Sequence, residues 1–197
     1  MDLILRLLEF AKTGGWVMIP VAFTSLLMWT LIGERLITFR RLGRRDMELQ
    51  AALHAAQGAP TNSFGYGLRA TLVRNFTRQR TGEVDLDRRI LQECAMRMEP
   101  IIERNLSMIG TLASVAPLLG LLGTVSGMIT TFLVIAQLGT GNARPLAGGI
   151  SEALVATQAG LLVAIPGLFA SVALRRRATK LSNRLDETRL LLQHQLR

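Results

Sequence analysis

The chain has 197 residues, of which 49% are hydrophobic and 19% are charged, and 23 basic residues stand against 14 acidic ones. An average soluble domain carries about 25% charged residues, so the distribution of the charges becomes the first question. A single cysteine, Cys94, and two histidines exclude an internal disulfide, a cluster of cysteine metal ligands and a histidine-rich metal site. No metal centre is therefore expected.

The chain opens with an amphipathic segment at residues 1–13. Apolar residues alternate there with Arg6, Glu9 and Lys12 at helical spacing. This pattern is typical of a short helix that lies in the membrane interface. Gly14 and Gly15 follow and are expected to end this helix.

Three long runs of the chain contain no charged residue: 14–33, 105–142 and 153–174. About 20 apolar residues of helix cross a hydrocarbon core about 30 Å thick, and each run is long enough. The sequence therefore predicts an all-helical membrane protein with three transmembrane helices, at 14–34, 105–138 and 148–174. For the first run the alternative is a cleaved signal peptide, although no small-x-small cleavage site follows it.

Residues 35–104, between the first two spans, form a segment too long for a turn. An arginine-rich helix is expected up to about Gln57, then a break at 58–65 and a second helix up to about Arg80. A third helical pattern begins near Asp85 and runs into the second span.

Pro100 interrupts this third pattern. Because proline lacks an N–H and its ring clashes with the preceding turn, a kink or register break is expected there. At the other end of the chain, Leu181, Leu185 and Leu192 form one stripe. Residues 175–197 are therefore predicted to continue the third span as a helix.

The basic residues predict the orientation of the spans. Twenty of the 23 lie in residues 35–104 or after residue 174, and the positive-inside rule places both segments in the cytoplasm. The N-terminus and the short loop at 139–147 then face the outer side. Arginine runs at the span ends suit anionic lipid headgroups: Arg40-Arg41, Arg44-Arg45 and Arg175-Arg176-Arg177. Nucleic acid is not expected as a partner, because no aromatic residues interleave with these arginines.

The three spans differ in the size of their side chains. The first is bulky, with Trp16, Phe23 and Trp29 among its residues, which suits a position facing lipid. The second and third contain small residues at intervals that let helix backbones approach closely: Gly120, Gly123, Gly127, Ala156, Gly160 and Ala164. These two spans are expected to pack against each other and against copies of themselves.

Pro117 and Pro166 lie inside the second and third spans. Each removes a helical hydrogen bond and predicts a kink. Ordinary transmembrane proline without a functional bend is the alternative.

Glu152 is the only acidic residue between Glu103 and Asp186. Its distance from Arg175 corresponds to about 34 Å of helix at roughly 1.5 Å per residue, which places it near the outer edge of the hydrocarbon. Two interpretations stay open. Glu152 is either an interfacial residue near a helix N-terminus, or a proton or partner site that faces a protein-lined cavity.

Thr124 and Thr157 are among the few polar residues at membrane depth. A threonine hydroxyl can bond to the carbonyl four residues earlier, so a structural role is the default interpretation. Thr157 lies about 140° around an ideal helix from Glu152, so the two cannot share a narrow face.

Two long motifs have a specific resemblance: APLLGLLGTVSGM at 116–128 and GGISEALVATQAGLLVAIPG at 148–167. Both resemble the signature spans of the MotA/TolQ/ExbB proton-channel family. GGWVMIP at 14–20 resembles the first span of the ExbB-type members. Three spans rather than four, with a long segment between the first two, fit ExbB and TolQ better than the flagellar stator MotA. The residues of these motifs favour an ExbB-type member.

This resemblance implies a homopentamer in the bacterial inner membrane, with its N-terminus and the 139–147 loop in the periplasm. The second and third spans would line a pore that holds a single-span protein similar to ExbD. Protons would be the coupling ion, with no cofactor, and the work would pass to a TonB-like protein that opens outer-membrane transporters. Motif by motif, Thr124 and Thr157 correspond to the pore threonines and Glu152 to the pore glutamate. Gln158 stands where many members have a small apolar residue, so the local polarity is expected to differ.

An enzyme is not expected, because Ser126, Ser151 and Cys94 have no histidine base nearby in the sequence. Two alternatives to an ExbB-like motor stay open. One is a TolQ-like motor for the cell envelope, or another specialised motor of the family. The other is a non-conducting membrane scaffold, for which Glu152 would be dispensable.

Overall fold

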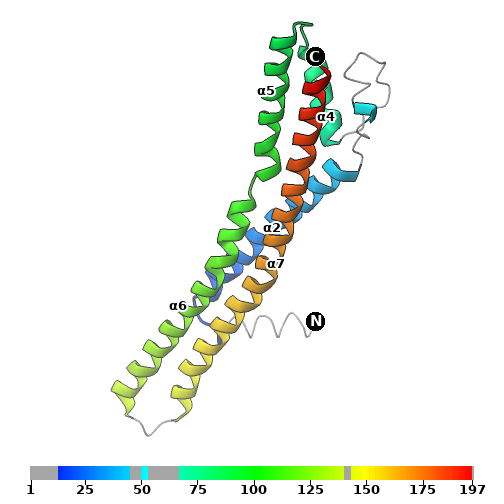
Figure 1. Ribbon diagram of the computed structural model, residues 1–197. Helices are drawn as coiled ribbons and strands as arrows, with labels where there is room; N and C mark the ends of the chain where they lie inside the picture. The colour runs from blue at the N-terminus through cyan, green and yellow to red at the C-terminus, as the bar shows by residue number, and fades with distance from the viewer. Residues whose placement is uncertain (1–12, 45–49, 53–66, 140–142, 197) are drawn as a thin grey trace. The chain divides into compact units, whose positions relative to one another are not determined.

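The computed structural model describes residues 13–44, 50–52, 67–139 and 143–196, and every regular element in these ranges is helical (Figure 1). The main helices are α2 (Met18–Arg44), α4 (Leu68–Gln79), α5 (Val84–Glu103), α6 (Leu106–Leu138) and α7 (Ala143–Gln195). Almost all of the amphipathic helix predicted at 1–13, and the break predicted at 58–65, lie outside the described residues.

Three stretches of helix are long and apolar enough to cross a membrane: Met18–Gly43, Val84–Gln137 and Pro145–Gln195. Each overlaps one of the uncharged runs of the sequence, and most of the charged residues of the second and third stretches lie in α5 and in the last part of α7. The predicted all-helical class with three membrane spans is therefore confirmed.

The chain divides into two compact units, and α2, α6 and α7 contribute to both. The first, which we call the apolar unit, takes the chain up to Ile32 and Met108–Val172. The second, the charged unit, takes Gly33–Ser107 and the chain from Ala173 onward.

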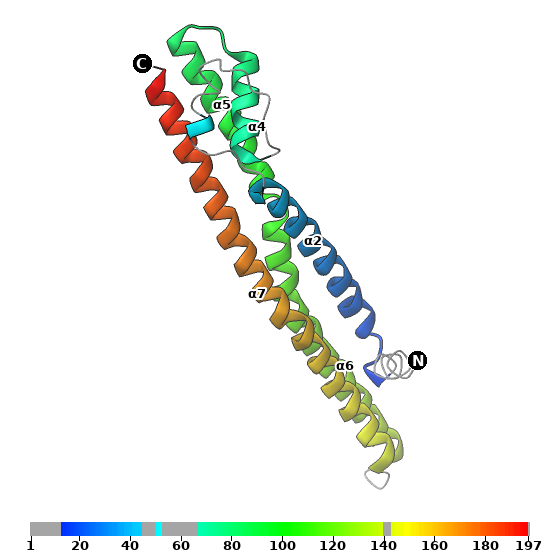
Figure 2. The same ribbon diagram turned by 90° about the vertical axis from the view of Figure 1, so that its right-hand side faces the viewer.

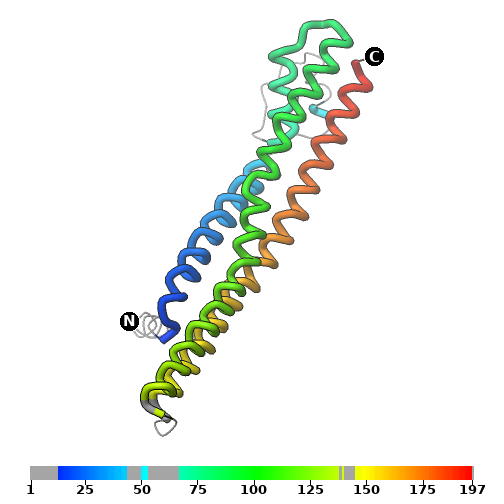
Figure 3. The backbone as a smooth tube through the Cα atoms, turned by 90° about the vertical axis from the view of Figure 1, so that its left-hand side faces the viewer, coloured from blue at the N-terminus to red at the C-terminus, as the bar shows by residue number. Residues whose placement is uncertain are grey.

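In the apolar unit, α2 lies alongside the pair formed by α6 and α7 (Figures 2 and 3). A small cluster of Val17, Val21 and Ala159 forms part of its interior. The bulky side chains of α2 lie on the outside, with Ile19 74% and Phe23 67% exposed. Exposed apolar side chains of this size are stable where lipid or another helix covers them. That α2 faces lipid stays a prediction.

Helices α6 and α7 run unbroken through Pro117 and Pro166, so the predicted kinks at these residues stay a prediction. Helix α7 begins at Ala143, within the segment where the sequence predicts a loop. It then continues as one helix to Gln195, which includes the helix expected after residue 174.

The helical break expected at Pro100 lies about one turn further on. Pro100 is still inside α5, and the break falls at Arg104 and Asn105, where Asn105 has a left-handed backbone with φ 60°. Proline removes a hydrogen bond from the last turn of α5, so the end of this helix is weakened and the chain can turn there.

Side chains of α2 stabilise this break within the charged unit. Arg35, only 2% exposed, donates a hydrogen bond of 3.0 Å to the carbonyl oxygen of Ile101. Its neighbour Glu34 accepts a hydrogen bond of 3.1 Å from the amide of Asn105. The break leaves carbonyls at the end of α5 without helical partners, and Arg35 supplies one of them with a donor.

The turn between α4 and α5 is organised by Asp87, which is buried and lies outside the uncharged runs. Its carboxylate accepts hydrogen bonds from Thr81 N–H at 2.8 Å, the Thr81 hydroxyl at 3.0 Å and Gly82 N–H at 3.2 Å, and pairs with Arg80 at 3.3 Å. Burial raises the pKa of Asp87, but these hydrogen bonds lower it by more, so its pKa lies below the usual value.

Candidate functional site on the membrane helices

Small residues bring the backbones of α6 and α7 into contact. A Cβ at position 120 would lie 3.1 Å from the carbonyl oxygen of Ala156 and 3.3 Å from the Cα of Gly160. A Cβ at position 123 would fall on the Cβ of Ala156, and Ala164 is only 1% exposed. In lipid, such close approach gains dispersion contact along the helix pair.

The same close contact continues toward the loop. A Cβ at position 127 would lie 2.6 Å from the carbonyl oxygen of Gly149 and 2.8 Å from the backbone nitrogen of Ala153. The hydroxyl of Thr131 occupies the space where a Cβ of Gly149 would stand, and it donates a hydrogen bond of 2.9 Å to Gly127. Positions 127 and 149 therefore require glycine, because there is no room for a Cβ between the two helices.

Thr157 joins the two helices by a hydrogen bond. Its hydroxyl lies 3.3 Å from the carbonyl oxygen of Gly120 on α6 and 3.2 Å from that of Ala153 on its own helix. The approach to Gly120 is open because this residue has no side chain. The hydroxyl of Thr124 instead donates to Leu121 within α6, at 2.6 Å.

Glu152 lies against the turn that precedes α2. Its carboxylate occupies the space where a Cβ of Gly15 would stand, and Gly15 has φ +70°. Position 15 thus requires glycine both for space and for its left-handed backbone. Next to it, the indole N–H of Trp16 donates a hydrogen bond of 3.1 Å to the hydroxyl of Ser126 on α6.

The three predicted pore residues therefore have different neighbours. Thr157 contacts α6, Glu152 contacts the turn before α2, and Thr124 bonds within its own helix. Among the described residues, no hydrogen bond joins any two of the three. The spacing of Glu152 and Thr157 along the helix predicted their separation. Nothing in the sequence predicted the contact of Glu152 with Gly15.

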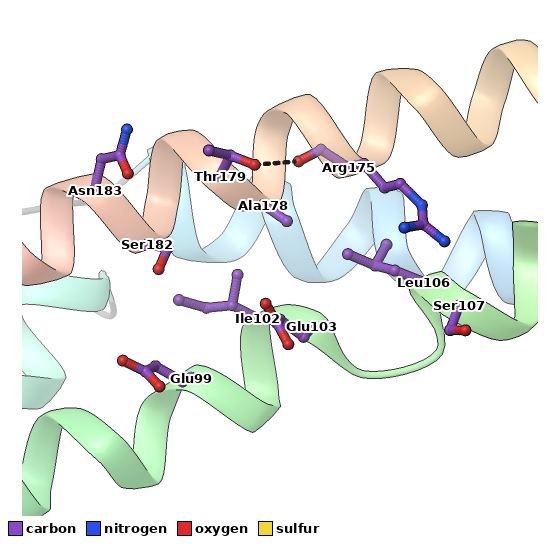
Figure 4. Close-up of a pocket in the computed structure, with 10 residues that line it drawn as sticks. All are labelled: Glu99, Ile102, Glu103, Leu106, Ser107, Arg175, Ala178, Thr179, Ser182 and Asn183. Atoms are coloured by element: carbon purple, nitrogen blue, oxygen red, sulfur yellow. Dashed lines mark hydrogen bonds between the residues drawn. The ribbon is translucent and has the colours of Figure 1, made fainter.

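The charged unit contains a polar pocket of about 520 Å³ that the sequence did not reveal (Figure 4). Glu99 and Glu103 line it from α5, and Arg175 lines it from α7. The hydroxyl of Thr179 points back along α7 and donates to the carbonyl oxygen of Arg175 at 3.1 Å. Such a mixture of acids, a cation and hydroxyls suits water. Among the described residues, no group of three or more His, Cys, Asp or Glu side chains could hold a metal ion.

Three apolar spans and a seam of small residues define a multi-pass helical membrane protein. The family model described as "MotA/TolQ/ExbB proton channel family" matches residues 60–187, which is more than half of the chain. The chain belongs to this family, as its motifs predicted. The family is one of proton channels rather than enzymes.

Several relatives have the name ExbB. "Biopolymer transport protein ExbB" of Pseudomonas putida is 31% identical over 176 residues, which cover 77% of this chain and 50% of the relative. The protein of that name from Salmonella typhimurium is 30% identical over 168 residues, covering 77% and 68%. "Putative biopolymer transport protein ExbB-like 3" of Synechocystis sp. is 33% identical over 169 residues, covering 81% and 80%. The chain thus spans half the length of the first of these relatives.

Proposed function

We propose that the chain is the ExbB-like subunit of an inner-membrane motor driven by the proton motive force. It works with an ExbD-like single-span partner and passes energy through a TonB-like protein to outer-membrane transport. Membership of the proton-channel family and the ExbB names of its relatives support this proposal.

The main support for the proposal is the isolated position of Glu152. It is the only acid on α6 and on α7 before Asp186. One acid cannot pass protons across about 30 Å of hydrocarbon. A second protein with its own acid must supply the rest of the path, and an ExbD-like helix would do so.

Exposed apolar faces support assembly into a ring. Leu121 and Val125 on α6, and Leu154 and Ile165 on α7, are each more than half exposed in the single chain. One three-helix protomer does not enclose a cavity, whereas several copies packed through these faces would. The resemblance sets the number at five, with Thr124 and Thr157 along the pore and Glu152 toward its outer mouth.

Orientation follows from the basic residues. The charged unit contains 20 of the 23 basic residues, and the positive-inside rule places it in the cytoplasm. The N-terminus then lies in the periplasm, and α7 extends into the cytoplasm.

Substitution of the polar residues tests the function. In cells deleted for the native gene, Glu152→Gln and Thr157→Val are expected to abolish TonB-dependent uptake, while the oligomer still forms. Thr130→Val is the matched control, because the Thr130 hydroxyl donates a hydrogen bond of 3.1 Å to the carbonyl oxygen of Ser126 on its own helix. Normal uptake in both test variants would favour the scaffold. Normal uptake in the deletion strain, combined with a leaky envelope, would favour a TolQ-like motor.

A further inference from the structure

A second pocket in the charged unit, of about 280 Å³, lies between α2 and α7. Four of its lining residues are cations: Arg40 from α2, and Arg177, Lys180 and Arg184 from α7. The buried side chains of Phe39 and Leu181 form an apolar part of its wall. The pocket thus combines a concentrated positive charge with an apolar surface.

The cations have no acidic partner among the described residues. None of the ion pairs in that part of the chain includes Arg40, Arg177, Lys180 or Arg184. On α7 the three cations share one face, because they follow one another at helical spacing. Like charges held this close repel each other, so an anion between them would be stabilised by all four.

The position of the pocket along the chain favours the membrane interface. On α7 the uncharged run ends at Leu174, and the three cations follow over about 15 Å of helix at roughly 1.5 Å per residue. Side chains on a helix tilt toward its N-terminus. On both α2 and α7 this direction leads back to the apolar span, so the charged groups lean toward the headgroup layer.

We propose that this pocket binds the phosphate of an anionic phospholipid headgroup. The four cations would hold the phosphate oxygens, with Arg40 and Arg177 offering planar, multidentate donors. Phe39 and Leu181 would contact the glycerol and the start of the acyl chains. Inorganic phosphate offers the same oxygens without the apolar part, which is why the apolar wall favours a lipid. This inference does not depend on the proposed transport function.

A pair of double variants separates a built site from diffuse attraction. Arg40→Ala/Arg177→Ala removes two pocket cations. Arg41→Ala/Arg176→Ala removes two exposed neighbours that do not line the pocket, with the same change in net charge. Delipidated full-length protein in mild detergent is titrated with phosphatidylglycerol and with phosphatidylethanolamine, and bound lipid is counted by native mass spectrometry.

The wild type should bind phosphatidylglycerol in preference to phosphatidylethanolamine. The pocket double variant should lose roughly tenfold or more in affinity for phosphatidylglycerol, and the control double variant less than about twofold. Inorganic phosphate at millimolar concentration should not displace the lipid. Equal losses in the two double variants, or no preference for the anionic lipid, would overturn the proposal. Displacement by inorganic phosphate would make the pocket a free-phosphate site instead.

A third variant fills the pocket without removing charge. Gly43 also lines it, and a Cβ at this position would meet no atom within 4 Å. Gly43→Phe should therefore fold normally and lower the affinity for phosphatidylglycerol as the pocket double variant does. Unchanged binding in Gly43→Phe would show that the lipid lies elsewhere.

Discussion

Replacement of Gly127 by alanine tests the helix packing on which the membrane site depends. The new Cβ would lie 2.6 Å from the carbonyl oxygen of Gly149, and 2.8 Å and 2.9 Å from the backbone nitrogen and the Cβ of Ala153. Two of these three atoms belong to the backbone of α7, so no side-chain rotation relieves the contact. The helices must separate by roughly 0.5–1 Å to restore ordinary contact distances.

Two opposing effects determine the expected magnitude. Overpacking of a tight contact costs about 1–3 kcal/mol, while alanine is favoured over glycine inside a helix by about 1 kcal/mol. Gly148→Ala measures the second effect alone, because a Cβ at position 148 would meet no atom within 4 Å. The unfolding free energy of Gly127→Ala should therefore lie about 1–3 kcal/mol below that of Gly148→Ala.

Reversible unfolding in mixed micelles, followed by circular dichroism, gives the unfolding free energies of the two variants and the wild type. Gly148→Ala should match or exceed the wild type, and Gly127→Ala should fall below it. Equal stabilities of the two alanine variants would refute the close contact of α6 with α7 at this position.

Arg35→Ala should lower the stability of the charged unit by about 1–3 kcal/mol, because the carbonyl of Ile101 loses its donor, and denaturant titration of the purified protein measures this. Because the pKa of Asp87 is lowered in the folded protein, its carboxylate contributes fully to the folding stability above the usual aspartate pKa of about 4. This contribution to stability is lost as the pH falls through the lowered pKa. Asp87→Asn should remove this part of the acid dependence, and an unchanged acid transition in the variant would contradict the role of Asp87. For topology, Cys94 is a poor probe, since it is 4% exposed and burial raises the pKa of its thiol. A cysteine at the 56% exposed Met96, in a Cys94→Ala background, should resist an impermeant thiol reagent outside intact spheroplasts and react after lysis.

Local patterns in the sequence predicted the helices well. The uncharged runs indicated the spans, since a charged side chain that faces hydrocarbon is costly. The glycines at 120, 123 and 127 indicated a close-packed face, because small residues at this spacing allow backbone contact. Both signals depend only on residues near one another in the chain.

Contacts between distant residues were not predictable in this way. The carboxylate of Glu152 fills the space beside Gly15, and nothing in either motif indicates this pairing. Near the start of α5 the apolar Leu86 is exposed, whereas the neighbouring Asp87 is buried. The hydrogen bonds that Asp87 accepts from the preceding turn explain its burial. The periodicity of apolar residues cannot predict such hydrogen bonds.

Glu152 is proposed to belong to a proton path that is complete only with a second protein. Proton flux into liposomes, with native mass spectrometry of the same preparation, tests this role. The protein alone should form a ring that is nearly impermeable to protons. Flux should appear when an ExbD-like single-span protein is reconstituted with it, and Glu152→Gln should abolish that flux. A stable monomer, or equal flux with and without the partner, would contradict the account.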